Sequence, residues 1–285
     1  MRIGPMSLVD SLLRLAIALL IVGALFTAVE RLWPARGRAD GAPRRPFLQR
    51  PLLRRGLGVD VGWWFFTGLI TRNVSRIVVG GGILAALAVS GSAMTIGDLR
   101  HGWGPLGGLP FWIQAVGILL VSDLAMYWLH RLKHRHPLWR FHAIHHSSED
   151  LDWLSATRLH PVDSILSDGL RAALLLGLGF APVAVAVAAP AFRLLAIGIH
   201  ADLRWDFGPL RYVIASPAFH RWHHTSAEEG RDRNFAGLFP VYDLMFGTFY
   251  MPRHRPTEFG VDEAVPRGLW RQLVWPFRSD AARSP

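Results

Sequence analysis

The sequence has no cysteine in its 285 residues, and this absence excludes several kinds of site. Disulfide bonds, thiolate-ligated haem, iron–sulfur clusters and cysteine zinc sites all need cysteine sulfur. A metal bound by this chain must therefore be held by nitrogen or oxygen. The sequence also lacks His-Glu-x-x-His, the motif that supplies two ligands and the general base of many zinc proteases.

Charged residues are few, and lysine is almost missing. Only 18% of the residues are Asp, Glu, Lys or Arg, whereas 51% are hydrophobic. Lys133 is the single lysine among 31 basic residues, and the formal net charge is +10. Such a composition is unusual for a water-soluble globule and indicates a membrane protein.

Four long apolar segments support this interpretation, at residues 12–33, 61–90, 109–129 and 170–199. The first, read as a retained anchor, and the third are each long enough to cross a hydrocarbon core of about 30 Å as a helix. The fourth is interrupted by prolines and is expected to be a hairpin of two helices. We therefore expect an all-α, polytopic integral membrane protein with about four to six membrane helices and a cytoplasmic, histidine-rich helical cap.

Arginines between the first two apolar segments set the expected orientation, because cytoplasmic loops are rich in basic residues. They are Arg36, Arg38, Arg44, Arg45, Arg50, Arg54 and Arg55. A single crossing by residues 60–90 then places the histidine-rich residues 130–168 and 200–254 on the cytoplasmic side. Arg72 and Arg76 fit poorly inside a span, so a broken segment, or two crossings with the opposite orientation, stays open. The arginine-rich stretch after residue 200 favours the single crossing.

Histidine is concentrated in one short stretch of the chain. Six of the thirteen histidines lie in the seventeen positions from His130 to His146, where even scatter would place roughly 0.8. Histidines three or four residues apart share one face of a helix, with Cβ atoms about 5–6 Å apart. Three sets have this spacing: His130 and His134; His142, His145 and His146; and His220, His223 and His224. One such pair would carry little weight, but eight histidines exceed the coordination of one ion and predict two metals.

The three sets, HRLKH, HAIHH and HRWHH, resemble the histidine boxes of the membrane-bound fatty acid hydroxylase and sterol desaturase superfamily. The resemblance extends through SDLAMYWLHRLKH, HHSSEDLDWLSATRLHPVD and RNFAGLFPVYDLMFGTFY, and it covers roughly residues 118–277. The stretches GPLRYVI, SPAFHRWHH and YDLMFGT look like the sterol-desaturase-like or alkylglycerol-monooxygenase-like branch. The resemblance implies a catalytic domain at residues 109–277. Residues 1–56 would form an anchor and basic loop, residues 57–108 further membrane structure, and residues 278–285 a tail.

The resemblance also implies a centre of two iron ions and additional residues around it. His160 and His200 are expected as further ligands, whereas His101, His136 and His254 fall outside the pattern. Metal-bound histidines need acceptors for their second ring nitrogen, and nearby acids are expected to provide them: Asp123, Glu149, Asp150 and Asp163. Asp123 is the strongest of these candidates, because a carboxylate inside a span is costly unless it is paired. Arg158 and Asn234 match family positions too, with a structural role at least as plausible.

The activity implied by the resemblance is O2-dependent oxidation of a lipid C–H bond by a membrane-bound di-iron oxygenase. Hydroxylation and desaturation are both open, as is the identity of the lipid. The expected partners are the lipid substrate, O2, membrane lipids and an external electron donor, either ferredoxin or a cytochrome with its reductase; nucleic acid is not expected. An acidic donor could dock on arginines of the cap. They are Arg204, Arg211, Arg221, Arg231 and Arg233.

Two other interpretations remain at this stage. The chain could be a metal-binding membrane protein without oxygenase activity, such as a transporter or a degenerate relative. It could also hold zinc in place of iron, because imidazole suits both metals. The arginine bias and the single-domain layout suggest the bacterial inner membrane as the location, with the histidine site facing the cytoplasm.

Overall fold

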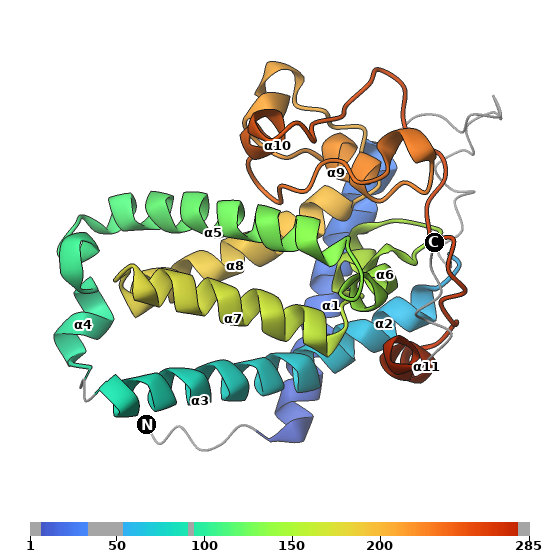
Figure 1. Cartoon of the computed structure of the whole chain (residues 1–285). Helices are drawn as coiled ribbons and strands as arrows, with labels where there is room; N and C mark the ends of the chain where they lie inside the picture. The colour runs from blue at the N-terminus through green and yellow to red at the C-terminus, as the bar shows by residue number, and fades with distance from the viewer. Residues whose placement is uncertain (1–6, 34–53, 91–93, 279–285) are drawn as a thin grey trace.

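The computed structural model describes residues 7–33, 54–90 and 94–278, and this part of the chain is helical (Figure 1). It contains no β-strand beyond an isolated antiparallel bridge between Thr225 and Phe259. The expected all-α fold is therefore confirmed. Arg36, Arg38, Arg44, Arg45 and Arg50 of the expected basic loop, and all of the tail except Arg278, lie outside the described residues.

The N-terminal part of the fold consists of one separate helix and one long helical run. Helix α1 (Leu8–Leu32) begins at a capping box, in which the side chains of Ser7 and Asp10 bond each other's backbone amides. Helix α2 (Leu57–Phe66), a π-helical turn (Thr67–Thr71) and helix α3 (Arg72–Ser90) follow each other without a break. This continuity supports one passage through the membrane rather than two.

Arg72 and Arg76 lie inside this continuous helix. The sequence alone was also compatible with an interruption of the helix at these arginines. The exposed Arg76 side chain donates to Asn73 one turn away, and Asn73 in turn donates to the carbonyl of Leu69. The polar side chains of Arg76 and Asn73 are thus satisfied within the helix, without a chain break.

The central helices run from the far end of the molecule toward the cap. Helix α5 (Phe111–Lys133) follows the short helix α4 (Ile96–His101), and helices α7 (Pro161–Gly177) and α8 (Pro182–His200) form the expected hairpin. Pro182 begins α8, where its missing N–H costs nothing, but Pro190 is accommodated within that helix. The first arm begins at Pro161 rather than near residue 170, as the sequence had suggested.

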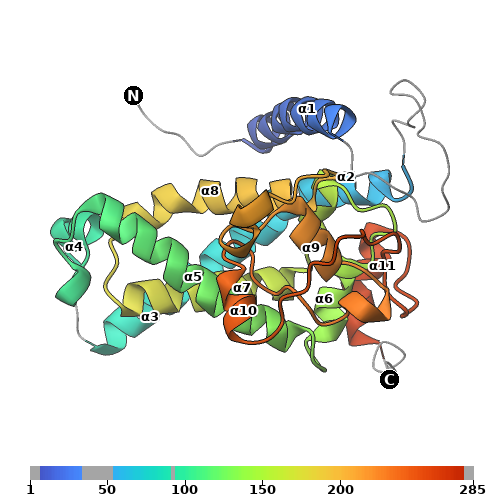
Figure 2. The same ribbon diagram turned by 90° about the horizontal axis from the view of Figure 1, so that it is seen from above.

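In the part of the chain that the structure describes, four helical segments are long and apolar enough to cross a membrane. They are Leu8–Leu32, Leu57–Val89, Phe111–Lys133 and Pro182–His200. The chain is thus an integral membrane protein of the expected kind. In Figure 1, α3, α5, α7 and α8 run side by side, whereas α1 crosses them steeply; Figure 2 shows α1 lying along one side of this bundle.

The cap gathers short helices at the end of the bundle where α5 and α8 finish. These are α6 (Trp139–His146), α9 (Pro217–His223), α10 (Val241–Met245) and α11 (Leu269–Val274). Buried Trp63 of α2 packs with Ala143, Ile144 and Trp275, which fixes α6 against α2 and the C-terminal segment. The cap is therefore held by apolar contacts on the side of α6 that turns away from its histidines.

Candidate metal centre

The ends of two long helices and two short helices bring nine histidines together. His130 lies in the last turn of α5 and His134 caps that helix, while His200 is the final residue of α8. The other six lie on α6 and on α9 with its C-cap: His142, His145, His146, His220, His223 and His224. Helix ends that converge at the base of the cap therefore supply the whole cluster.

The nine histidines divide into two groups, within each of which the possible ligand atoms all lie within 4.8 Å of one another. The five-histidine group contains His130, His134, His142, His146 and His223. The four-histidine group contains His145, His200, His220 and His224. Each group is a candidate site for one ion.

Each His-x-x-His-His set is shared between the two groups. On α6, His142 and His146 belong to the five-histidine group and His145 to the four-histidine group. After Ser216 the assignment is reversed, because His220 and His224 belong to the four-histidine group and His223 to the other. The i, i+4 pair, one helical turn apart, thus shares a site, and the residue between them reaches the neighbouring site.

The spacing of the ring nitrogens fits metal coordination. In the five-histidine group, Nε2 of His142 lies 3.0 Å from Nε2 of His130 and 3.2 Å from that of His146. In the four-histidine group, Nε2 of His200 lies 3.1 Å from those of His145 and His220. Two imidazoles bound at right angles to one ion, with bonds of about 2.1 Å, place their nitrogens about 3.0 Å apart.

Two buried ring nitrogens that face the five-histidine group, His134 Nε2 and His223 Nε2, have no hydrogen-bond partner among the described residues. Unpaired buried polar atoms are rare and call for an explanation, such as a bound ion. Burial also lowers the pKa of the six cap imidazoles well below its usual range, which keeps them in the neutral form that binds metal. The donor set thus fits two ions with nitrogen ligands.

Backbone carbonyls orient four of the imidazoles. Because a carbonyl can only accept, each of these rings carries its proton on Nδ1 and turns the lone pair of Nε2 toward its group. The pairs are His130 with Phe235 (2.8 Å), His145 with Arg158 (3.2 Å), His200 with Ala196 (2.5 Å) and His223 with Arg233 (2.8 Å).

Carboxylates orient two further imidazoles, both in the five-histidine group. Asp163 lies 2.7 Å from Nδ1 of His142, and its other oxygen accepts from Lys133 at 2.5 Å. Asp232 lies 3.0 Å from Nδ1 of His134. Asp163 was expected beside the histidines, whereas Asp232 was not; it contacts a residue 98 positions away, and no local spacing marks it.

Comparison with known proteins agrees with this geometry. Residues 115–248 match the family model described as "Fatty acid hydroxylase". This part of the chain is similar to a fatty acid hydroxylase domain. The predicted resemblance to the fatty acid hydroxylase and sterol desaturase superfamily is thereby confirmed. No solved structure matches the chain.

Three of the curated relatives are named as a lipid hydroxylase or an alkylglycerol monooxygenase. The chain is 35% identical over 173 residues to "Ornithine lipid hydroxylase OlsE" of Rhizobium tropici, which covers 59% of this chain and 51% of that protein. It is 34% identical over 141 residues to "Alkylglycerol monooxygenase" of Danio rerio, and this alignment covers 49% of this chain and 30% of that protein. It is 34% identical over 129 residues to the alkylglycerol monooxygenase of Homo sapiens, and this alignment covers 45% of this chain and 28% of that protein. The chain thus spans about half, or less, of the length of these relatives.

Three acids expected beside the metals of the hydroxylase domain lie elsewhere in the structure. Asp123 is buried, but it accepts from the backbone amides of residues 237–239 and contacts none of the histidines. Glu149 is exposed and pairs with arginines, and Asp150 accepts from the amide of Arg55. These three do not orient metal ligands in this arrangement, because their carboxylates serve the loop and surface contacts.

His160 is also not brought to either group, although it was expected as a ligand. It precedes the first turn of α7, where its Nδ1 accepts from the amide of Val162, and its Nε2 lies 3.1 Å from the carbonyl of Leu273. Both ring nitrogens are therefore engaged, and His160 caps the helix that carries Asp163. Of the two additional histidines, only His200 joins the nine-histidine cluster.

Arg158 and Asn234 support the centre through their neighbours. The guanidinium of Arg158 donates to buried Asp60 of α2 at 2.6 Å and to Ser147 at 3.0 Å, which fixes the carbonyl that holds His145. Asn234 donates to the carbonyls of Phe219 and Tyr250, which joins α9 to the following loop. No local pattern marks Asp60, because its partner Arg158 is 98 positions away.

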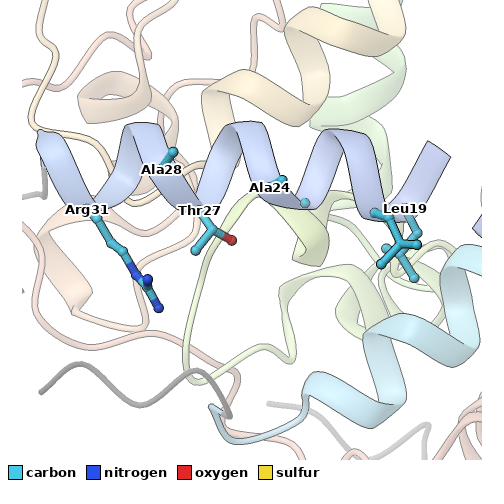
Figure 3. A pocket seen from close by; sticks show the side chains of 7 residues that line it. Leu19, Ala24, Thr27, Ala28 and Arg31 are labelled. Atoms are coloured by element: carbon cyan, nitrogen blue, oxygen red, sulfur yellow. The ribbon is translucent and has the colours of Figure 1, made fainter. Parts of the chain in front are cut away.

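A hollow of about 470 Å³ lies along α1 (Figure 3). Its wall is mostly apolar, with Leu19, Ala24 and Ala28, and carries the polar side chains of Thr27 and Arg31. No histidine lines it among the described residues. The hollow is therefore separate from the metal centre.

Proposed function

We propose that this chain is a membrane-bound di-iron oxygenase that hydroxylates an unactivated C–H bond of a lipid, with O2 and an external electron donor. The observation that carries the proposal is the division of nine histidines into two adjacent nitrogen-lined groups. The relatives named as a lipid hydroxylase and as alkylglycerol monooxygenases support a lipid substrate and a monooxygenase reaction.

The two histidine groups would each hold one iron ion. Imidazole nitrogen suits both iron and zinc, and we assign iron because the named relatives carry out oxidations. Iron bound there would supply the redox chemistry that activates O2. The chain itself positions neutral imidazoles through the four carbonyls, Asp163 and Asp232.

Water exclusion is the second contribution of the chain. The seven histidines other than His130 and His134 are buried within the cap, and burial favours a dry site with well-ordered ligands. Because α5 and α8 carry His130 and His200 at their ends, a lipid tail held beside these spans has its reacting carbon within reach of the centre.

Electrons are proposed to come from ferredoxin or from a cytochrome with its reductase, on the cytoplasmic side of a bacterial inner membrane. The arginines expected to dock such a donor differ in accessibility. Arg221 is buried and donates to the carbonyl of Leu151, whereas Arg231 is exposed and pairs with Asp262 at 2.8 Å. Of the two, only Arg231 offers charge at the surface where a donor could dock.

Metal analysis of the purified full chain tests the proposal. A variant with His145→Ala and His146→Ala removes one ligand from each group, and His136→Ala removes an exposed histidine outside both. We expect two irons per chain in the wild type and in His136→Ala, and a large loss in the double variant. Lipids are then incubated with the iron-loaded protein, O2 and a reductant, and hydroxylated product is measured by mass spectrometry.

Two results would overturn the proposal. A well-folded wild-type preparation with no stoichiometric metal would remove the centre altogether. Stoichiometric zinc after growth in iron-rich medium, with no iron uptake on reconstitution, would leave a metal protein without the proposed oxygenase chemistry.

A further inference from the structure

A loop of the cap lies against the middle of a membrane helix. Residues 237–246, which include α10, follow α5 on its outer side, as Figure 1 shows. The hydroxyl of Tyr242 donates to the carbonyl of Leu120 at 3.0 Å, and the rings of Phe246 and Trp128 lie 4.7 Å apart. The loop thus runs along the span between residues 120 and 128.

Its position along α5 sets its depth. Leu120 precedes His130 by ten residues, which corresponds to about 15 Å along a helix. It also lies well inside the segment Phe111–Lys133 that is apolar enough to cross the membrane. If α5 crosses the bilayer, the loop around Tyr242 lies at the depth of the hydrocarbon rather than beyond it.

The outward side of α10 is apolar. Val241, Leu244 and Met245 are 38%, 46% and 66% exposed, and none of them belongs to the apolar cluster formed by Tyr127, Phe235, Ala236 and Tyr242. They continue the exposed apolar surface of α5, where Trp128 is 48% exposed. A continuous exposed apolar surface of this kind marks a contact with another apolar phase.

Buried carboxylates satisfy the backbone amides that lead into this loop and begin it. Asp123 accepts from the amides of Gly237, Leu238 and Phe239 at 3.1, 2.9 and 2.7 Å. Asp243 accepts from the two preceding amides, of Phe235 and Ala236, at 2.7 and 2.9 Å.

Non-helical backbone at membrane depth is tolerated only when the protein itself satisfies its polar groups. Two buried carboxylates that accept from the five consecutive amides of residues 235–239 are in line with that requirement. The same contacts account for Asp123 inside α5, because an intramembrane carboxylate is costly unless it is paired with donors.

We propose that residues 237–246 form a membrane-embedded re-entrant element whose outer face, made by Val241, Leu244 and Met245, contacts lipid acyl chains. The bilayer is the partner of this surface because the surface is continuous with that of α5, which itself faces lipid. The proposal does not depend on the metals or on the oxygenase reaction.

The absence of cysteine makes the test direct, because one introduced cysteine is the only labelling site. Met245→Cys and, separately, Leu244→Cys are labelled with a nitroxide in the full chain, in phospholipid nanodiscs. Val116→Cys, on the exposed side of α5, is the reference within the membrane, and Glu228→Cys is the exposed reference on the cap. Electron paramagnetic resonance then measures collisions with O2, which partitions into lipid, and with a water-soluble nickel chelate.

We expect the labels at positions 244 and 245 to behave like the label at 116, with nickel collisions several-fold fewer than at 228 and with frequent O2 collisions. Nickel accessibility equal to that at 228 would overturn the proposal, because the loop would then lie in water. Protection from both reagents, with dipolar broadening that disappears on dilution with unlabelled protein, would overturn it too, in favour of a second copy covering α10.

Discussion

Asp163 lies 2.7 Å from Nδ1 of His142 and thereby fixes which nitrogen of that ring faces the five-histidine group. Its other oxygen accepts from Lys133 at 2.5 Å, so one buried carboxylate joins a metal-facing imidazole to a buried ammonium. Both Asp163 and Lys133 are less than a tenth exposed. The acid therefore has a structural role and a role at the metal centre at the same time.

Asp163→Asn tests the role of this carboxylate beside the histidines. The amide keeps the shape but not the charge, which leaves the Lys133 ammonium buried without a counterion and weakens the orientation of His142. Loss of such a partner commonly lowers metal affinity about 10–100-fold. We expect faster metal loss to a chelator, followed by mass spectrometry, with the exposed Glu149→Gln as a matched control. Equal retention in the two variants would contradict this role.

The two groups predict separable metal sites. His223→Ala removes a residue of the five-histidine group, and His200→Ala removes one of the four-histidine group. Each is expected to lower the metal content by about one ion, since one buried ligand contributes strongly to one site only. Metal content by mass spectrometry on folded monodisperse protein checks this. Loss of both ions in each variant would show that the groups bind as one unit.

His160→Ala is expected to leave the metal content unchanged. The substitution removes the cap of α7 and should lower the free energy of unfolding by about 1 kcal/mol. Thermal unfolding in detergent, read beside metal analysis, distinguishes the outcomes. A metal content reduced as far as in His200→Ala would restore His160 to the ligands.

The Arg158–Asp60 pair predicts a large stability effect. Both partners are buried, their atoms are 2.6 Å apart, and Arg54 donates to the second oxygen of Asp60. Asp60→Asn leaves two arginines with a neutral partner, and breaking such a buried pair typically costs about 3–5 kcal/mol.

We expect a clear fall in the thermal unfolding temperature of Asp60→Asn, measured in detergent. Arg55→Gln, at an 81% exposed side chain, should leave that temperature nearly unchanged. A similar effect of the two substitutions would show that the buried pair contributes no more than a surface ion pair.

The local sequence predicts the helices and the histidine cluster because both depend on short-range spacing. His142, His145 and His146 are marked by their spacing alone, and the hairpin around residues 178–181 is marked by Pro182. Asp232, by contrast, contacts His134, which lies 98 positions earlier in the sequence. Asp60 and Arg158 are separated by the same number of positions. His160 has the sequence neighbours of a ligand, but its ring caps α7 and contacts the carbonyl of Leu273 instead of joining either histidine group. Asp123 was expected to orient a metal ligand, but its carboxylate binds backbone amides that no local pattern identifies.

Lys133 gives the chain an internal chemical reporter. It is the single lysine of the sequence, 6% exposed and held by Asp163 and Ser167 between α5 and α7. No other side chain of this protein carries a primary amine. The rate at which an amine-reactive reagent modifies Lys133, read by mass spectrometry of the peptide that contains it, therefore measures how often the two helices separate beside the histidines.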